Sequence, residues 1–355
     1  MMTKTWKGAL AALLGGVVLA AAPGLPGREA RAETIELKVS HYLPPNNTTS
    51  KELARWADEL AEKSNGRLKI SIFGSGQMGP PPRQYDLART GVADIAFLLH
   101  GFLPGRFALT ELAHLPNIFD RADREGAVRP LSNAEASAIM TGLIPDLAAE
   151  YPGTRPLYLI AGPTLSPMFN KAEVRTPAAM KGLRIRHNGP ISAAMLESWG
   201  ATPAAVAPVE LSDAVQKGTI DGLLFNYEAA QSFQIGADIH TVTELKSAAV
   251  TFALVINQKR YEALPADLRA LIDQTTGAAA ARRIGALYDQ AEADGRDYLL
   301  KSGVRITVPT AAEREAFRNA AAPVADRTVA ALEAKGQPAR AILQKLRAAV
   351  AGVGP

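Results

Sequence analysis

The sequence predicts a two-lobed α/β protein with a ligand cleft between its lobes. The chain of 355 residues is long enough for two domains, at roughly 100–200 residues each. Strand patterns alternate with helix patterns along the chain, an order typical of a mainly parallel sheet. A spaced set of three residues also occurs once in each half of the sequence. Two similarly built lobes, braced by long helices near the C-terminus, account for these observations.

Composition excludes several classes of protein. The sequence is 47% hydrophobic and 21% charged, which is ordinary for a globular protein and excludes wholesale disorder. It contains no Cys, so disulfide frameworks, thiolate metal sites and Cys nucleophiles are excluded together. The formal net charge is +4, and the first 32 residues contribute +3 through Lys4, Lys7, Arg28 and Arg31 against Glu29. The remaining chain is near neutral and predicts no nucleic-acid partner.

The first 32 residues have the layout of a secretory signal peptide. Lys4 and Lys7 form a positive start, residues 8–22 are an unbroken apolar run, and A-R-A over residues 30–32 offers a cleavage site. The run of 15 residues is shorter than the ~20 that a membrane-spanning helix needs. We therefore expect cleavage near Ala32 and a mature periplasmic protein.

The first half of the remaining chain predicts three strands joined by two helices. Alternating apolar residues indicate a strand over 35–41, and a capping-box pattern, Thr49-x-x-Glu52, starts a helix that ends at Gly66. Two further strands and the helix between them are expected over residues 68–72, 94–99 and 82–90. The order strand, helix, strand, helix, strand favours parallel pairing with helical crossovers.

The second half repeats this arrangement. Strands are expected over 183–186 and 220–225, with helices over 190–199 and 209–217 between them. The spaced residues are Asp86, Gly91 and Asp94 in the first half and Asp213, Gly218 and Asp221 in the second, each 127 positions further along. In each half they fall on a helix, on the glycine that ends it and on the following strand. Because ligands of such sheets bind at the carboxyl ends of the strands, two facing lobes predict a cleft.

The C-terminal third predicts mostly helix. Helices are expected over 267–272 and 276–302, followed by a strand over 304–308. We expect these segments to cross between the lobes and brace the hinge. The predicted domain division is a signal peptide over 1–32, a first lobe over 33–160 and 251–290, and a second lobe over 161–250 and 291–355.

Motifs of enzyme and cofactor chemistry are absent or incomplete in the sequence. Residues 74–79 match G-x-G-x-x-G, but three prolines follow, so the helix of a dinucleotide site cannot begin there. The sequence has no phosphate-binding P-loop, no G-x-S-x-G element and no close pair among its five His. Asp and Glu are plentiful, yet nothing selects a catalytic pair. We therefore predict a binding protein rather than an enzyme, with no cofactor and no metal.

Several motifs together resemble one family of exported binding proteins. The segment R-T-P-A-A-M-K-G-L-R-I-R over 175–186 is preceded and followed by shorter matches, namely G-R over 66–67, G-Q-M-G over 76–79, G-V-A-D over 91–94, G-A-T-P over 200–203 and V-Q-K-G-T-I-D-G over 215–222. In this order, over residues 34–320, they resemble the periplasmic solute-binding subunit of tripartite ATP-independent periplasmic (TRAP) transporters, the dicarboxylate-binding P-subunit family. The resemblance implies the periplasmic binding protein fold, a small organic acid as ligand and a TRAP membrane permease as partner.

The resemblance assigns Arg186 to the substrate carboxylate, because the family's signature arginine ends the matching segment. A guanidinium fork fits both oxygens of a carboxylate, and a partly dehydrated cleft strengthens the bond. Without the resemblance, a surface arginine at a strand end would be the preferred interpretation of both Arg186 and Arg184. Further candidate ligand contacts are Tyr42, Leu99, His100, Phe102, Arg106, Ser166, Met168, Phe225, Asn226 and Tyr227. For each of these, packing or a loop contact is the alternative.

Departures from the family pattern narrow the range of candidate ligands. Sialate-binding members have a second arginine 20 residues before the signature one, where this sequence has Ser166, and a Glu where it has Leu99. Because most cleft candidates are aromatic or apolar, a small monocarboxylate with an apolar or aromatic body suits the site better than a sialic acid. Dicarboxylates stay an alternative, since His100 or Arg106 could hold a second anion. Glu228 lacks the converging partners that a metal site needs.

The leading functional hypothesis is a periplasmic receptor that delivers an organic acid to a TRAP permease. An exported receptor for another transporter class, or a sensor, is the second hypothesis, and a periplasmic enzyme is the third. The ordered set of motifs favours the first. We expect a monomer rather than a dimer.

Overall fold

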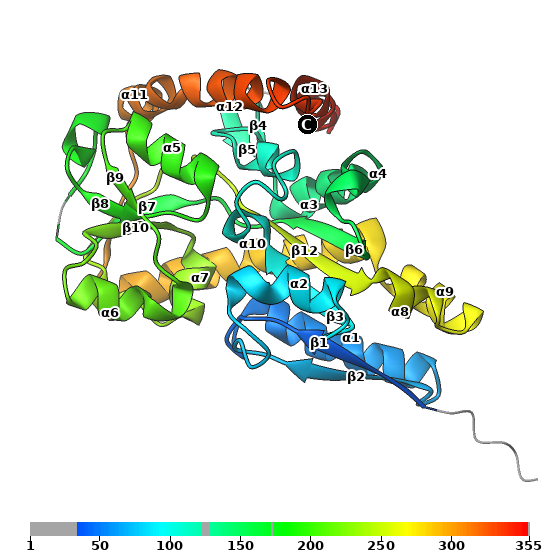
Figure 1. Ribbon diagram of the computed structural model, residues 1–355. Helices are drawn as coiled ribbons and strands as arrows, with labels where there is room; N and C mark the ends of the chain where they lie inside the picture. Colours follow the sequence, from blue (N-terminus) through cyan, green and yellow to red (C-terminus); the bar gives the residue numbers. More distant parts are fainter. Residues whose placement is uncertain (1–33, 123–127, 172, 354–355) are drawn as a thin grey trace, which may run out of the picture. The chain divides into compact units, whose positions relative to one another are not determined.

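Two β-sheets organise the part of the chain that the computed structural model describes, which is residues 34–122, 128–171 and 173–353 (Figure 1). The predicted signal peptide over residues 1–32 lies outside the described residues. We call each sheet with its covering helices a lobe. Within the described residues, no helix is both long and apolar enough to cross a membrane.

The first sheet has five strands in the order β2-β1-β3-β12-β6. They are β1 (Ile35–Ser40), β2 (Leu68–Phe73), β3 (Ile95–Leu99), β6 (Thr154–Ala161) and β12 (Thr251–Asn257). β1 pairs in parallel with β2 and β3, and the crossovers contain α1 (Thr48–Lys63) and α2 (Gln84–Arg89), as the sequence predicted. β12 is antiparallel to both of its neighbours, so the sheet is mixed rather than mainly parallel.

The second sheet has six strands in the order β13-β11-β7-β10-β8-β9. They are β7 (Ser166–Phe169), β8 (Arg184–Arg186), β9 (Thr202–Ala204), β10 (Gly222–Phe225), β11 (Thr241–Thr243) and β13 (Arg305–Thr307). β8 pairs in parallel with β9 and β10, and α5 (Pro190–Ser198) and α6 (Leu211–Gln216) connect these strands. β7 is antiparallel to β10 and β11. The prediction of two α/β lobes is confirmed, and the mixed pairing is the correction.

The strands that run antiparallel are the ones that the sequence pattern did not reveal. Every residue of β7 and of β12 is buried. A strand that is buried on both faces shows no alternation of apolar and polar residues, and a short apolar run alone does not distinguish strand from helix.

The repeated Asp-Gly-Asp set has the same structural role in both lobes. Oδ2 of Asp94 accepts a hydrogen bond from the backbone N–H of Lys38 on β1 at 2.8 Å, and the N–H of Asp94 donates back to the Lys38 carbonyl at 3.0 Å. Asp221 makes the same pair of bonds with Arg184 on β8, at 2.9 and 2.8 Å. The glycine three residues before each Asp has a positive φ, +78° and +66°, which suits glycine.

The long helix α10 (Gly277–Lys301) crosses both lobes. It contacts α3 (Asn133–Gly142) and β6 in the first lobe, and α7 (Tyr227–Ser232) and β13 in the second. Its 25 residues span about 38 Å at 1.5 Å per residue. The bracing helix that the sequence predicted is therefore present.

Two glycines of α10 permit close packing, one against each lobe. A methyl group at Gly285 would lie 2.5 Å from Cα of Ala134 on α3. A methyl group at Gly295 would lie 2.3 Å from the carbonyl oxygen of Tyr227 on α7. Any larger side chain at either position would force the helix away from its neighbour.

The remaining elements complete the two lobes. They are β4 (Asp120–Ala122), β5 (Val128–Pro130), α4 (Ile144–Leu147), α8 (Gln258–Glu262), α9 (Ala266–Thr275), α11 (Ala311–Ala321), α12 (Pro323–Glu333) and α13 (Ala339–Ala351). α13 packs against α3 and β4, and its Ile342 and Leu346 join an apolar cluster of the first lobe. The domain boundaries stay a prediction, and α13 is the element whose contacts differ from them.

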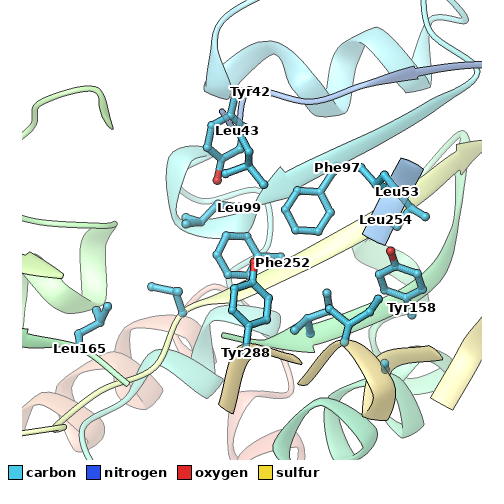
Figure 2. Close-up of a cluster of buried hydrophobic side chains, with 14 of the residues drawn as sticks. Tyr42, Leu43, Leu53, Phe97, Leu99, Tyr158, Leu165, Phe252, Leu254 and Tyr288 are labelled. Carbon is cyan, nitrogen blue, oxygen red and sulfur yellow. The ribbon is translucent and has the colours of Figure 1, made fainter. Parts of the chain in front are cut away.

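One cluster of buried apolar side chains continues from the first sheet through α10 to the second sheet. Within it, the ring of Phe252 stacks on Phe97 at a centroid distance of 5.3 Å and on Tyr288 at 6.5 Å (Figure 2). Phe252 and Tyr288 thereby connect the core of the first lobe to a cavity between the two sheets.

Candidate functional site

A small cavity lies where strands of the two sheets end. Leu99 ends β3, Arg186 ends β8 and Phe225 ends β10, and all three line the cavity. Its volume is about 40 Å³, which holds only a few water molecules. The other lining residues are Tyr42, Leu43, Asn47, Phe102, Leu165, Asn188, Pro208, Asn226, Glu228, Ala229, Phe233, Val250, Phe252 and Tyr288. Larger hollows exist elsewhere, such as one of about 580 Å³ beside β6, but they are more open to solvent. The small cavity differs from them because the buried charged residues Arg186 and Glu228 line it.

Arg186 places a buried cation in the cavity wall, with its side chain 0% exposed. Its Nε donates to the carbonyl oxygen of Val206 at 3.2 Å, and Nη1 donates to Oδ1 of Asn188. Nη2 has no hydrogen-bond partner, and no carboxylate of the described residues pairs with the guanidinium. Burial lowers the pKa of Arg186 to about 10. Because a buried charge is costly unless it is paired, this group has unmet capacity for an anion.

Asn188 fixes the orientation of the guanidinium. Its Nδ2 donates to the carbonyl oxygen of Leu224 at 2.7 Å, so its Oδ1 is directed toward Arg186. The backbone N–H of Asn188 donates to Oγ of Ser192 at 3.0 Å. With Nε and one proton of Nη1 occupied, Nη2 is the free arm of Arg186.

Aromatic rings surround this cation. Cζ of Arg186 lies 5.3 Å from the ring centroid of Phe225 and 5.8 Å from that of Phe102, within the range of cation–π attraction. The ring of Tyr42 meets Phe102 edge to face at 5.8 Å. Burial raises the pKa of Tyr42, so its phenol is neutral, and in Figure 2 its hydroxyl points toward Leu99.

The two lobes touch backbone to backbone beside the cavity. A methyl group at Gly101, just after β3, would lie 2.1 Å from the carbonyl oxygen of Asn188. A methyl group at Gly189, just after β8, would lie 2.7 Å from Cα of Gly101. Glycine at both positions is therefore what allows the two strand ends to approach this closely.

A second charged residue, Glu228, also lines the cavity and is only 4% exposed. Its Oε1 accepts from Nδ2 of Asn47 at 2.9 Å, from N and Oγ1 of Thr48 at 3.1 and 3.2 Å, and from Oγ of Ser232 at 2.8 Å. Burial raises the pKa of Glu228, and the bonds from Thr48 and Ser232 oppose that shift. Since Asn47 and Thr48 begin α1 and Glu228 lies on α7, this acid links the two lobes. Among the described residues, no group of three or more His, Asp or Glu could hold a metal ion.

Six of the predicted contact residues line the cavity: Arg186, Tyr42, Leu99, Phe102, Phe225 and Asn226. Asn226 also caps α7, because its Oδ1 accepts from the N–H of Ala229 at 2.7 Å. Their role as ligand contacts stays a prediction, and the structure brings the six together.

His100 and Arg106 do not line the cavity, so neither supplies a second anion site there. His100 is fully buried in the first lobe, where Nδ1 contacts Oγ1 of Thr251 at 2.8 Å and Nε2 contacts the hydroxyl of Tyr151 at 2.8 Å. Burial lowers the pKa of His100 to about 3, so it is neutral. Arg106 is exposed, and its guanidinium lies 4.7 Å over the ring of Tyr85.

Ser166, Met168 and Tyr227 also pack away from the cavity. Oγ of Ser166 accepts from the N–H of Lys246 at 3.1 Å. Met168 belongs to the apolar core of the second lobe. The hydroxyl of Tyr227 donates to Glu244 at 3.1 Å. All three are positioned by the pairing of β7 and by the turn into α7, which a single strand pattern does not reveal.

Other lining residues escaped the sequence interpretation. Asn188 could have been predicted from the sequence. It is a polar residue two positions after Arg186, the predicted end of the strand, and it lines the same cavity. Asn47 lies between the predicted strand over 35–41 and α1, the helix that it caps. Phe252 and Tyr288 come from β12 and α10, and only the fold brings them to this place.

The chain is similar to known binding proteins over most of its length. The model of bacterial extracellular solute-binding protein family 7 (DctP) matches residues 39–331. The outer membrane transporter protein TsaT of Comamonas testosteroni is 26% identical over 302 residues, which is 83% of this chain and 85% of the relative. The C4-dicarboxylate-binding periplasmic protein DctP of Rhodobacter capsulatus is 27% identical over 273 residues, 73% of this chain and 75% of the relative.

Solved structures agree with the fold. A TRAP solute-binding protein from Rhodoferax ferrireducens in complex with copurified benzoate has a TM-score of 0.82 at 27% identity, covering 89% of this chain and 98% of that one. A TRAP periplasmic solute-binding protein from Bordetella bronchiseptica with bound (R)- and (S)-mandelate has a TM-score of 0.79 at 25% identity, with the same coverage. The resemblance found in the sequence is confirmed: the chain belongs to bacterial extracellular solute-binding protein family 7, the family of the TRAP solute-binding proteins.

Proposed function

We propose that this protein is a periplasmic receptor that captures a small monocarboxylate with an apolar or aromatic body and delivers it to a TRAP-type membrane permease. The observation that carries the proposal is the buried guanidinium of Arg186. Its Nη2 has no partner within the described chain, and aromatic rings surround it. The predicted signal peptide, with cleavage near Ala32, supports a periplasmic location.

A ligand carboxylate would both accept a hydrogen bond from Arg186 and neutralise its charge. It supplies an acceptor for Nη2 and the negative charge that the guanidinium lacks. Hydrogen bonds between ionised groups are roughly twice as strong as neutral ones, and exclusion of water strengthens them further. An uncharged amide of the same shape supplies an acceptor without the charge.

The cavity walls favour an apolar or aromatic body. Phe102, Phe225 and Phe252 line the cavity and offer ring faces and edges. The relatives solved with benzoate and with mandelate hold aromatic monocarboxylates, which supports the same class here. The Rhodobacter relative is named for C4-dicarboxylates. Against a dicarboxylate in this protein, His100 and Arg106 lie outside the cavity.

Entry of such a ligand requires the lobes to separate. A cavity of about 40 Å³ is too small for a benzene ring with a carboxylate. Hinge opening and closure is the usual motion of periplasmic binding proteins. Closure over the ligand would exclude water from Arg186 and give the permease a distinct shape to recognise.

A thermal-shift and calorimetry series tests the proposal. Benzoate and mandelate should raise the melting temperature, since a ligand at one hundred times Kd adds about 2.7 kcal/mol to the free energy of unfolding. Benzamide, the uncharged match to benzoate, should give little shift, and so should glucose. Recovery of unaltered acid after long incubation would show binding without turnover. Absence of a shift with every organic acid in a broad set would contradict the receptor function.

A further inference from the structure

We propose that Glu228 makes the cavity selective for carboxylates that carry a hydrogen-bond donor, a hydroxyl or amino group, away from the carboxylate, and that it rejects dicarboxylates. The inference rests on the proposed function, because it needs the ligand carboxylate to lie at Arg186. It adds a second polar contact that neither the sequence motifs nor the relatives assign.

The two oxygens of the Glu228 carboxylate are used unequally. Oε1 accepts from four donor atoms, on Asn47, Thr48 and Ser232. Oε2 accepts only from Nδ2 of Asn47, at 3.2 Å. A carboxylate oxygen can accept about two hydrogen bonds, so Oε2 has capacity left. Since Glu228 lines the cavity, a donor on the ligand is the partner that this capacity suits.

The acid and the cation of the cavity do not pair with each other. Nη2 of Arg186 is without a partner although a carboxylate lines the same cavity. Tyr42 lies within the field of both groups: burial dominates the rise of its pKa, Arg186 lowers that pKa and Glu228 raises it. The cavity therefore has a positive end and a negative end, with the phenol of Tyr42 in the range of each.

Burial raises the pKa of Glu228, and the hydrogen bonds that its carboxylate accepts oppose this shift and favour the ionised form. The backbone N–H of Thr48 and the side-chain NH₂ of Asn47 can only donate, and both donate to the carboxylate. Thr48 is the first residue of α1, where the helix dipole favours a negative charge. An ionised Glu228 attracts an O–H or N–H of the ligand and repels a second carboxylate, and repulsion of this kind is a common basis of specificity.

Calorimetry on the full mature protein tests this with ring-substituted benzoates. The probes are benzoate, its 3- and 4-hydroxy and 3- and 4-amino derivatives, and the dicarboxylates isophthalate and terephthalate. Both ring positions are included because the angle between Arg186 and Glu228 selects one of them. The better hydroxy or amino isomer should bind about tenfold more tightly than benzoate, as a charge-assisted hydrogen bond predicts. Both dicarboxylates should bind at least about tenfold more weakly than benzoate.

The variant Glu228→Gln sharpens the test. Its carbonyl oxygen can stay with the donors of Thr48 and Ser232, which directs the amide NH₂ toward the place of Oε2. The preference for amino-substituted benzoates should then disappear, and the penalty on the dicarboxylates should fall to about threefold or less. The matched control is Glu150→Gln, since Glu150 is also a buried acid that accepts from backbone N–H groups, those of Leu109 and Thr110, but lies outside the cavity. The control should keep the wild-type ranking.

The outcomes separate this inference from the proposed function. If the wild-type protein binds none of these acids, both fail. If it binds benzoate but binds isophthalate or terephthalate equally well, only the role of Glu228 is overturned. An unchanged ranking in Glu228→Gln overturns it too. Should that variant fail to fold, the order of the wild-type affinities for benzoate, its hydroxy and amino derivatives and the dicarboxylates still tests the inference.

Discussion

The two strand ends that meet at the cavity contain similar residues and have opposite roles. Residues 99–102 begin at the last residue of β3, and residues 186–189 begin at the last residue of β8. Each stretch contains a histidine and a glycine. The glycines touch each other across the lobes. After β3, however, the polar side chain turns into the core, where His100 meets Thr251 of β12. At the end of β8, the polar side chain of Arg186 keeps a free donor at the cavity.

The neighbouring elements explain the difference. β12 runs beside β3 and supplies acceptors to His100, so that group is satisfied inside the first lobe. β10 runs beside β8 and ends in Phe225, an apolar residue that leaves Arg186 without a carboxylate. The polar group that the fold does not satisfy is the one that marks the site, and buried polar groups are otherwise almost always satisfied.

The largest expected effect separates Arg186 from Arg184, two positions apart on β8. Arg186→Ala and Arg186→Lys should each weaken benzoate binding by about tenfold or more, because lysine keeps the charge but loses the fork. Arg184 is 46% exposed and pairs with Asp221, so Arg184→Ala should leave affinity within about twofold. Calorimetry measures both. Wild-type affinity in Arg186→Lys would contradict the bidentate contact.

A further substitution, Arg186→Met, distinguishes a binding arginine from a structural one. Removal of a buried, unpaired charge should not lower the free energy of unfolding of the ligand-free protein, and can raise it. Denaturant unfolding of Arg186→Met without ligand measures this. Strong destabilisation would mean that Arg186 holds the fold together.

The next effect tests the contact between the two glycines. Gly101→Ala puts a methyl group where the carbonyl of Asn188 lies, so the lobes cannot close fully. If the closed state falls to about a tenth of its population, the apparent affinity falls about tenfold. Small-angle scattering should show a ligand-dependent decrease in the radius of gyration for the wild type and a smaller one for the variant. Gly142→Ala is the control, since nothing lies within 4 Å of the added methyl. Equal closure in both variants would show that the contact at Gly101 does not limit closure. An unchanged radius of gyration in the wild type would argue for a preformed pocket.

A smaller effect concerns the aromatic residue at the end of β3. Phe102→Leu keeps an apolar contact but removes a ring that lies 5.8 Å from the guanidinium carbon of Arg186. Benzoate binding should weaken about threefold to tenfold, while binding of cyclohexanecarboxylate should change less. The ratio of the two dissociation constants is the measurement. A constant ratio would show that Phe102 contributes shape alone.

The smallest effect on binding is expected from His100. Its pKa is lowered from 6.5 to about 3, so the unfolded chain takes up the proton first. The stability it contributes is present above pH 6.5 and is lost as the pH falls toward 3. Between pH 7.5 and 5.5, the free energy of unfolding should therefore fall less steeply in His100→Gln than in the wild type. Part of the fall should remain in the variant, because the pKa of His114 is lowered in the same way.

Binding should respond differently from stability. Because His100 stays neutral and lies outside the cavity, acid should not tighten the binding of succinate or terephthalate through it. Dicarboxylate binding that strengthens below pH 6.5 in the wild type, and not in His100→Gln, would restore His100 as an anion contact.

Local patterns predicted the elements whose signals are local. The strand at 35–41 alternates, and it was predicted within one residue. The helix that follows was also predicted, but the expected capping box of Thr49 and Glu52 is wrong: Asn47 caps the helix, which runs over Thr48–Lys63. β7 and β12 lack alternation because both of their faces are buried. Their absence from the prediction is what made the sheets look mainly parallel.

The site was predictable only in part, because a local sequence pattern does not show which way each side chain points. Phe225, Asn226 and Tyr227 are consecutive, yet only the first two line the cavity, because Asn226 caps α7 and the chain turns there. Position after a strand is a local property, whereas the direction of a side chain depends on the neighbouring strand. The identification of Arg186 came from the resemblance to a family, and its burial without a partner is a property that only the fold reveals.

The central position of β12 has a consequence for how the chain folds. Val255 of β12 pairs with Ala96 of β3, and on its other side β12 pairs with β6, so the first sheet stays in two parts until residue 257 is available. Contacts this distant in sequence form slowly, because a long loop must close first. Until then β3 and β6 each present an unpaired edge, which is a template for aggregation. Translation products that stop before β12 are therefore expected to depend on chaperones. The first lobe cannot complete its folding until the last third of the chain has begun to be synthesised.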